Sequence, residues 1–168
     1  NMIKTFNSLF VTMFGLGKIR FIPGTFGSLA TVIILFYLFH TLNLSSNIIL
    51  IGLIIIFIYS FYAVSNHTKD NVNKDPGEIV IDEFLGQSIP IYLYEISHGT
   101  TKESGEAIIY YILFFILFRY FDIMKPFPVS FIDRNFKNSF GVIMDDVCAG
   151  FYVVLTLVCF MIIKSYVL

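Results

Sequence analysis

The chain has 168 residues, of which 57% are hydrophobic and 14% are charged, and its mean hydropathy is +0.79. A soluble domain of ordinary composition is far less apolar, so the sequence predicts an all-α integral membrane protein with a single membrane-embedded domain over residues 1–168. The formal net charge is −1 and the chain lacks an Arg-rich segment, so we expect no nucleic acid as a partner.

The N-terminal part of the chain predicts an interfacial element and a glycine-rich turn. Residues 1–22 place apolar side chains at helical spacing among polar ones, which indicates a short amphipathic helix on the membrane surface, or a plain lead-in to the first span. The next block, PGTFGS at 23–28, holds the hydroxyls of Thr25 and Ser28 at the start of a predicted helix. Such a helix N-terminus can bind phosphate, although the same residues also serve as ordinary helix-start residues and no Walker A lysine follows.

The rest of the chain predicts a bundle of about five transmembrane or re-entrant helices. Four apolar runs have about the length that a bilayer crossing requires, at residues 26–44, 47–64, 107–121 and 145–164. A fifth, residues 79–96, begins with Asp82 and Glu83 and is interrupted by Gly86 and Pro90, so we expect a short, bent or re-entrant crossing. Polar segments at 67–78, 97–106 and 125–144 predict loops.

Five crossings place every Lys and Arg except Lys102 and Lys164 on one side of the membrane. By the positive-inside rule this side is cytoplasmic. The same count gathers acidic residues at the ends of three spans on that side: Asp82, Glu83, Asp122, Asp133, Asp145 and Asp146.

These acids admit two interpretations. Carboxylates near hydrocarbon are costly and usually mark a function, but single acids at helix ends also reach water and gain from the helix dipole. Several carboxylates that converge without a cation would repel one another, and a divalent metal removes that repulsion. Because no His or Cys lies in the pattern, oxygen ligands favour Mg²⁺ over zinc.

Cationic side chains complete the pattern at FRYFDIMKPFP, residues 118–128. Arg119, Asp122 and Lys125 are three residues apart and predict one face of the last helical turn, where positive charge is favoured. One interpretation is that these residues form a structural ion-pair ladder and have no further role. Since they lie at an aqueous interface beside acids, we favour binding of an anionic headgroup.

Four ordered blocks resemble the phosphatidylglycerophosphatase A family: PGTFGS (23–28), DPGEIVIDEFLG (75–86), FRYFDIMKPFP (118–128) with IDRN (132–135), and GVIMDDVCAG (141–150). The resemblance covers the chain from about Gly15 to Gly150. The chain departs from the family in the apolar runs, in the loop at 97–106 and after Gly86, where Gln87 and Ser88 replace an expected aromatic-containing segment. The family consists of multi-pass enzymes of the bacterial inner membrane that convert phosphatidylglycerophosphate to phosphatidylglycerol.

The resemblance implies a Mg²⁺-dependent phosphomonoester hydrolase that acts on phosphatidylglycerophosphate in the bilayer, with the active site facing the cytoplasm. It implies these roles: catalytic Asp82, Glu83, Asp122 and Asp146; metal ligands Asp82, Glu83, Asp145 and Asp146; phosphate-binding Arg119, Lys125 and Arg134, with Thr25 and Ser28 as secondary contacts. Asp122 would be a ligand or a general base, Asp133 would orient Arg134, and the attacking group is either a carboxylate or water.

Two other functions use similar residues. A phospholipid synthase of the CDP-alcohol type needs a spaced Asp-x2-Asp-Gly-x2-Ala-Arg signature, whereas DDVCAGF at 145–151 has adjacent acids and no Arg. A non-enzymatic ion or solute carrier would place acids in the middle of its spans and would often show an inverted repeat. Here the acids are predicted at span ends. The sequence carries no signal for an oligomeric state.

Overall fold

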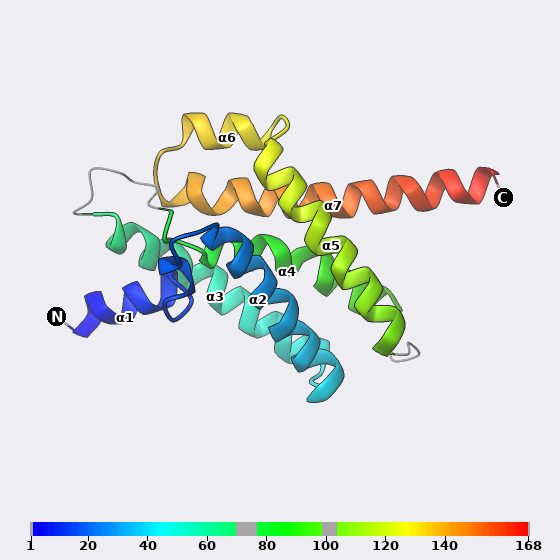
Figure 1. Ribbon diagram of the computed structural model, residues 1–168, viewed down its shortest axis with the longest axis horizontal. Helices are drawn as coiled ribbons and strands as arrows, with labels where there is room; N and C mark the ends of the chain where they lie inside the picture. The colour runs from blue at the N-terminus through cyan, green and yellow to red at the C-terminus, as the bar shows by residue number, and fades with distance from the viewer. Residues whose placement is uncertain (1, 70–76, 99–103, 168) are drawn as a thin grey trace.

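The structure is a computed structural model that describes residues 2–69, 77–98 and 104–167 (Figure 1). In these three ranges all regular elements are helical, which confirms the predicted all-α class. The elements are α1 (Met2–Val11), the 3₁₀ turn η1 (Leu16–Lys18), α2 (Pro23–Phe36), the π turn η2 (Tyr37–Thr41), α3 (Ser46–His67), α4 (Ile81–His98), α5 (Ser104–Met124), α6 (Val129–Asn135) and α7 (Ser139–Val167).

Four helical segments are long and apolar enough to cross a membrane: Pro23–Thr41, Ser46–His67, Gly105–Met124 and Ser139–Ile163. They coincide with the four spans expected from hydropathy, although the first begins and ends three residues before its apolar run and the last begins six residues before its run. The protein is therefore a multi-pass membrane protein. Residues 70–76 of the predicted loop at 67–78 and residues 99–103 of the predicted loop at 97–106 lie outside the described residues, as do Lys74 and Lys102 of the charge argument.

α4 is the central helix of the bundle, and it contacts α2, α3, α5 and α7. Asp82, Glu83 and Glu95 make it too polar to count among the four spans, and most of its side chains are buried by its neighbours. Its 18 residues extend for about 27 Å. The helix continues without a break through Pro90, so of the short, bent or re-entrant crossing expected for residues 79–96 the re-entrant form is excluded.

At Pro90, α4 packs against a glycine of α7. Proline cannot donate a hydrogen bond to the carbonyl four residues earlier, which here belongs to Gly86. That carbonyl oxygen faces Gly150 of α7, at a point where a Cβ on Gly150 would strike it. The backbone of α7 therefore packs directly against the group that Pro90 leaves without its helical partner.

The glycines also set how closely α4 and α7 approach. A Cβ on Gly86 would strike the carbonyl oxygen of Asp146 and would lie 2.7 Å from Cε2 of Phe118. Small residues permit such close crossings of membrane helices. Asp82 precedes Gly86 by four residues, and Asp146 precedes Gly150 by four, so each acid lies one turn before the crossing on the same face. The crossing thus brings the two acids together.

The region predicted as a loop at 125–144 is largely helical, which corrects that prediction. It contains α6, which packs on α7, and the first turns of α7 itself. Asn138 caps α7, because its Oδ1 accepts a hydrogen bond from the Gly141 N–H at 3.1 Å. Asp145 and Asp146 consequently lie in the second turn of α7 and not at its start, and their side chains are buried in the bundle.

The N-terminal helix is shorter than the predicted 1–22. α1 ends at Val11 and packs on α3, where Tyr59 donates a hydrogen bond to Oδ1 of Asn7 at 2.6 Å. Its other face exposes Met2, Ile3 and Phe6, as an interfacial helix requires.

Candidate active site

A cavity of about 350 Å³ lies at one end of the bundle, where α2, α4 and α7 begin and α5 ends (Figure 1). Seven of its lining side chains are charged: Asp82, Glu83, Arg119, Asp122, Lys125, Asp145 and Asp146. All of them come from three of the motif blocks found in the sequence, and Gly24 from the fourth block also lines the cavity. The fold therefore joins blocks that are far apart in the chain.

Three carboxylates form the centre of the site. Asp82, Glu83 and Asp146 each offer an oxygen atom, and these atoms lie within 4.8 Å of one another. Asp82 and Asp146 are 8% and 4% exposed. Within the described ranges, Oε2 of Glu83 and Oδ2 of Asp146 are buried and have no hydrogen-bond partner.

A divalent cation fits this donor set. Buried carboxylates at such separations repel one another strongly, and their oxygen atoms are the ligands that Mg²⁺ prefers. Three of the four predicted ligands are thus brought together.

The fourth predicted ligand, Asp145, lies apart from this group. Its Oδ2 accepts a hydrogen bond from Nζ of Lys125 at 2.9 Å, and its Oδ1 accepts one from the Asp146 N–H at 3.0 Å. Asp145 lines the cavity but is occupied by an internal ion pair. It positions Lys125 instead of joining the group of three.

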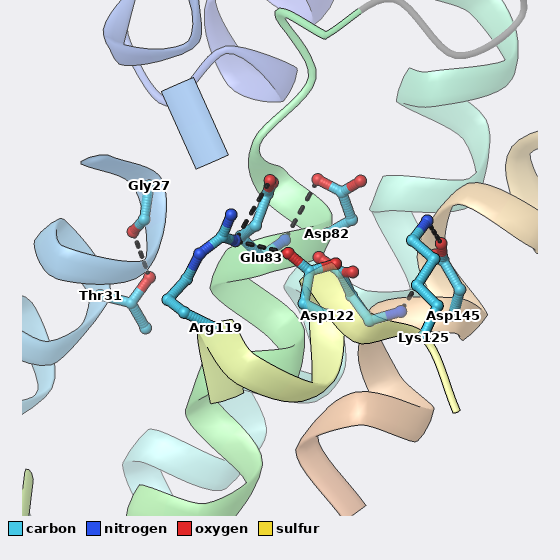
Figure 2. Close-up of polar contacts among 9 residues, drawn as sticks. Gly27, Thr31, Asp82, Glu83, Arg119, Asp122, Lys125 and Asp145 are labelled. Carbon is cyan, nitrogen blue, oxygen red and sulfur yellow. Dashed lines mark hydrogen bonds and ion pairs between the residues drawn. The ribbon is translucent and has the colours of Figure 1, made fainter. Parts of the chain in front are cut away.

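The two cations of the cavity are held by different acids (Figure 2). Nη1 of Arg119 lies 2.6 Å from Oδ2 of Asp122 and 3.9 Å from Oε1 of Glu83. Lys125 contacts Asp145 and also Asp133 of α6, at 3.0 Å. Burial lowers the pKa of Lys125, but the hydrogen bonds to Asp145 and Asp133 outweigh it, so the pKa rises and the ammonium stays charged.

The prediction that Arg119, Asp122 and Lys125 share the last turn of one helix is therefore confirmed only for the first two. Arg119 and Asp122 pair within α5, whereas Lys125 follows the last residue of the helix with a φ of 44°. This left-handed turn before Pro126 ends the helix and directs the chain toward α6. Lys125 then pairs with acids of α6 and α7, which places a second cation on the opposite wall from Arg119.

Three predicted phosphate-binding residues are absent from the described lining of the cavity. Arg134 is exposed near the end of α6, and Asp133 pairs with Lys125 and not with Arg134. Thr25 and Ser28 lie in the first turns of α2, where Ser28 is fully buried. The cavity contact of this block is Gly24, at which a Cβ would strike the carboxylate of Glu83.

Sequence reasoning missed the glycines that shape the site. Gly24 lets α2 approach Glu83, and the pair Gly86 and Gly150 lets α4 meet α7. One signal for the pair was present, since glycine follows the acid by four residues in both IDEFLG and MDDVCAG. Apolar wall residues such as Ile79 and Val142 carried no signal of their own.

The comparisons with known proteins agree with the motifs. The sequence profile of the family Phosphatidylglycerophosphatase A matches residues 9–161. A Haemophilus influenzae phosphatidylglycerophosphatase A is 37% identical over 84% of this chain and 80% of its own, and the Escherichia coli protein of that name is 31% identical over 82% and 73%. A Bacteroides thetaiotaomicron protein, provisionally named phosphatidylinositol-3-phosphatase, is 34% identical over 84% of both chains.

No solved structure gives a significant match to this chain. The family profile covers all four motif blocks, and the relatives match most of the length of the chain. The chain belongs to the phosphatidylglycerophosphatase A family and is a phosphoric monoester hydrolase.

Proposed function

We propose that the chain hydrolyses the terminal phosphate of phosphatidylglycerophosphate in a Mg²⁺-dependent reaction that gives phosphatidylglycerol and inorganic phosphate. The observation that carries this proposal is the charge of the cavity. Five carboxylates and two cations line it, which leaves a net charge of −3 when all are ionised. A phosphate monoester is itself an anion, so it needs a bound cation to enter.

The residues of the cavity divide into three roles. Asp82, Glu83 and Asp146 would hold the cation, because their oxygen atoms converge. When bound there, Mg²⁺ would supply charge stabilisation to the phosphoryl oxygens and would lower the pKa of a water molecule. Arg119 and Lys125, on separate walls, would donate hydrogen bonds to the non-bridging oxygens as charge develops in the transition state.

Asp122 is our candidate for the general base. It lines the cavity next to Arg119 but lies outside the group of three converging carboxylates. A carboxylate in this position can accept the proton of an attacking water molecule, while its ion pair with Arg119 fixes its orientation. The beginnings of α2 and α4 direct their positive dipole ends at the same space, which also favours a phosphate group.

The position of the acids does not favour the carrier alternative. The converging carboxylates lie in the first turn of α4 and the second turn of α7, at one end of the bundle. A transport pathway would need acids along the depth of the spans. Membership of a hydrolase family likewise argues against a CDP-alcohol synthase.

The direct test is release of inorganic phosphate by the purified protein in detergent. We expect release from phosphatidylglycerophosphate with Mg²⁺ and none with EDTA. Phosphatidylinositol 3-phosphate serves as the competing lipid, and glycerol 3-phosphate as a soluble control with the same phosphomonoester. Activity that persists in EDTA would contradict the metal site, and preference for the inositol lipid would reassign the substrate.

We further propose that the cavity faces the cytoplasm of a bacterial inner membrane, in accord with the positive-inside rule. Lys137, between α6 and α7, marks the end of the bundle that carries the cavity, and Ser45, before α3, marks the other end. Both are exposed. In a variant without Cys148 and Cys159, a membrane-impermeant thiol reagent added to spheroplasts should label Ser45→Cys and should label Lys137→Cys only after lysis. The reverse pattern would invert the orientation.

A further inference from the structure

Two neutral polar side chains lie buried beside the catalytic cavity without hydrogen bonds. Ser28 of α2 and Gln87 of α4 are both 0% exposed. Within the described ranges, Oγ of Ser28 and both Oε1 and Nε2 of Gln87 have no hydrogen-bond partner. Buried polar side chains in folded proteins are almost always paired, so an amide with both ends unpaired requires an explanation.

The helical register places Ser28 and Gln87 on the faces along which α2 and α4 pack. Gly24 of α2 lies against the carboxylate of Glu83 on α4. Ser28 follows Gly24 by four residues and Gln87 follows Glu83 by four, so each lies one turn further along its own helix on the same face. α2 and α4 pack together and both begin at the cavity. Both residues therefore lie on the packed faces of α2 and α4, one turn further from the cavity than Gly24 and Glu83.

Glu83 has a matching unpaired atom. Its Oε1 is directed to Arg119, whereas its Oε2 is buried without a partner. Gln87 lies four residues later on the same helix, and side chains at this spacing are neighbours. Oε2 of Glu83, which lacks a donor, thus lies one helical turn before Nε2 of Gln87, which lacks an acceptor.

We propose that Gln87 is a positioning residue for Glu83. Its amide N–H donates a hydrogen bond to Oε2 of Glu83, directly or through one water molecule, and the Ser28 O–H donates to Oε1 of Gln87. The proposal rests on the proposed Mg²⁺ site. Carboxylate ligands are usually held by such outer hydrogen bonds, and their loss typically weakens metal binding or activity about 10- to 100-fold.

The decisive variant is Gln87→Leu, which keeps the size of the side chain and removes its hydrogen bonds. We expect the Mg²⁺ concentration at half-maximal activity to rise about 10-fold or more. The same shift should appear without substrate, as a higher Mg²⁺ concentration needed to raise the Tm. The Tm in EDTA can fall by the contribution of the lost hydrogen bonds, so the Mg²⁺ midpoints and not this Tm decide the test.

Ser88→Ala is the matched control. Ser88 is adjacent in α4 and buried, but its hydroxyl donates to the Phe84 carbonyl at 2.6 Å within the same helix. This variant should leave both Mg²⁺ midpoints unchanged. Gln87→Met provides a second apolar variant, and Ser28→Ala should shift both midpoints in the same direction by a smaller factor.

A Gln87→Leu protein with a lower Tm in EDTA and unchanged Mg²⁺ midpoints would show a merely structural role and overturn the proposal. If neither Gln87 variant folds, unchanged midpoints in Ser28→Ala would overturn it. Failure of the proposed function is seen separately, because the wild-type protein would then show no Mg²⁺-dependent phosphate release.

Discussion

Asp146→Asn is expected to reduce kcat by more than about 100-fold, beyond the loss that follows removal of an outer hydrogen bond to a ligand. Asp146 is 4% exposed and is the member of the carboxylate group contributed by α7. Asparagine keeps the shape but removes the charge that would bind Mg²⁺. Release of inorganic phosphate from the lipid in detergent measures the effect.

The same variant should become more stable without metal. In EDTA the three converging carboxylates repel one another. Removal of one charge reduces this repulsion in the folded state and should raise the Tm. The rise in Tm that Mg²⁺ gives the wild-type protein should disappear. Asp133→Asn is the control, since Asp133 pairs with Lys125 but is not among the described lining residues. An Asp146→Asn protein with wild-type activity and Mg²⁺ response would refute the metal site.

Gly86→Ala is expected to disrupt the fold around the site. The added Cβ would strike the backbone of α7 at Asp146, where no flexible side chain can yield. Overpacking of this kind typically costs about 1–3 kcal/mol, and separation of α4 from α7 would also pull apart the carboxylate group. We expect a lower Tm in detergent together with a loss of activity larger than the lost folded fraction explains.

Gly52→Ala is a matched control in another membrane helix. A Cβ at Gly52 of α3 meets no atom within 4 Å, so alanine should be neutral or slightly stabilising through its higher helix propensity. Gly150→Ala should reproduce the Gly86 effect from the other side of the crossing, because its Cβ would strike the Gly86 carbonyl. Equal behaviour of Gly52 and Gly86 variants would show that the close crossing is unimportant.

Hydropathy predicted the four apolar spans well because each consists of a continuous run, such as residues 47–64 within α3. Hydropathy failed where tertiary contacts determine the course of the backbone. Pro90 argued for a break in α4, but the missing side chain of Gly150 accommodates the freed carbonyl. The polar residues of 125–144 suggested a loop. Instead α7 begins before the apolar run, because Asn138 caps the helix and Val142 and Ile143 are buried in the bundle.

Prediction of the site succeeded for local motifs and failed for tertiary contacts in the same way. The motifs predicted Asp82, Glu83 and Asp146 as members of one group, and their oxygen atoms do converge, since Asp82 and Asp146 each lie one helical turn before the crossing. Residue type alone could not tell Arg119, whose side chain lines the cavity, from Arg134, which is exposed. That difference depends on the left-handed turn at Lys125, which local sequence does not specify.

The place of the cavity at the end of the bundle has a consequence for the direction of the reaction. The two products of a lipid phosphomonoester belong to different phases, because inorganic phosphate dissolves in water and the lipid remains in the bilayer. A cavity at this position opens where both phases meet, so each product can leave without crossing the other's medium. The enzyme can then turn over while its substrate and lipid product stay in one leaflet, and dilution of phosphate into the aqueous phase opposes the reverse reaction.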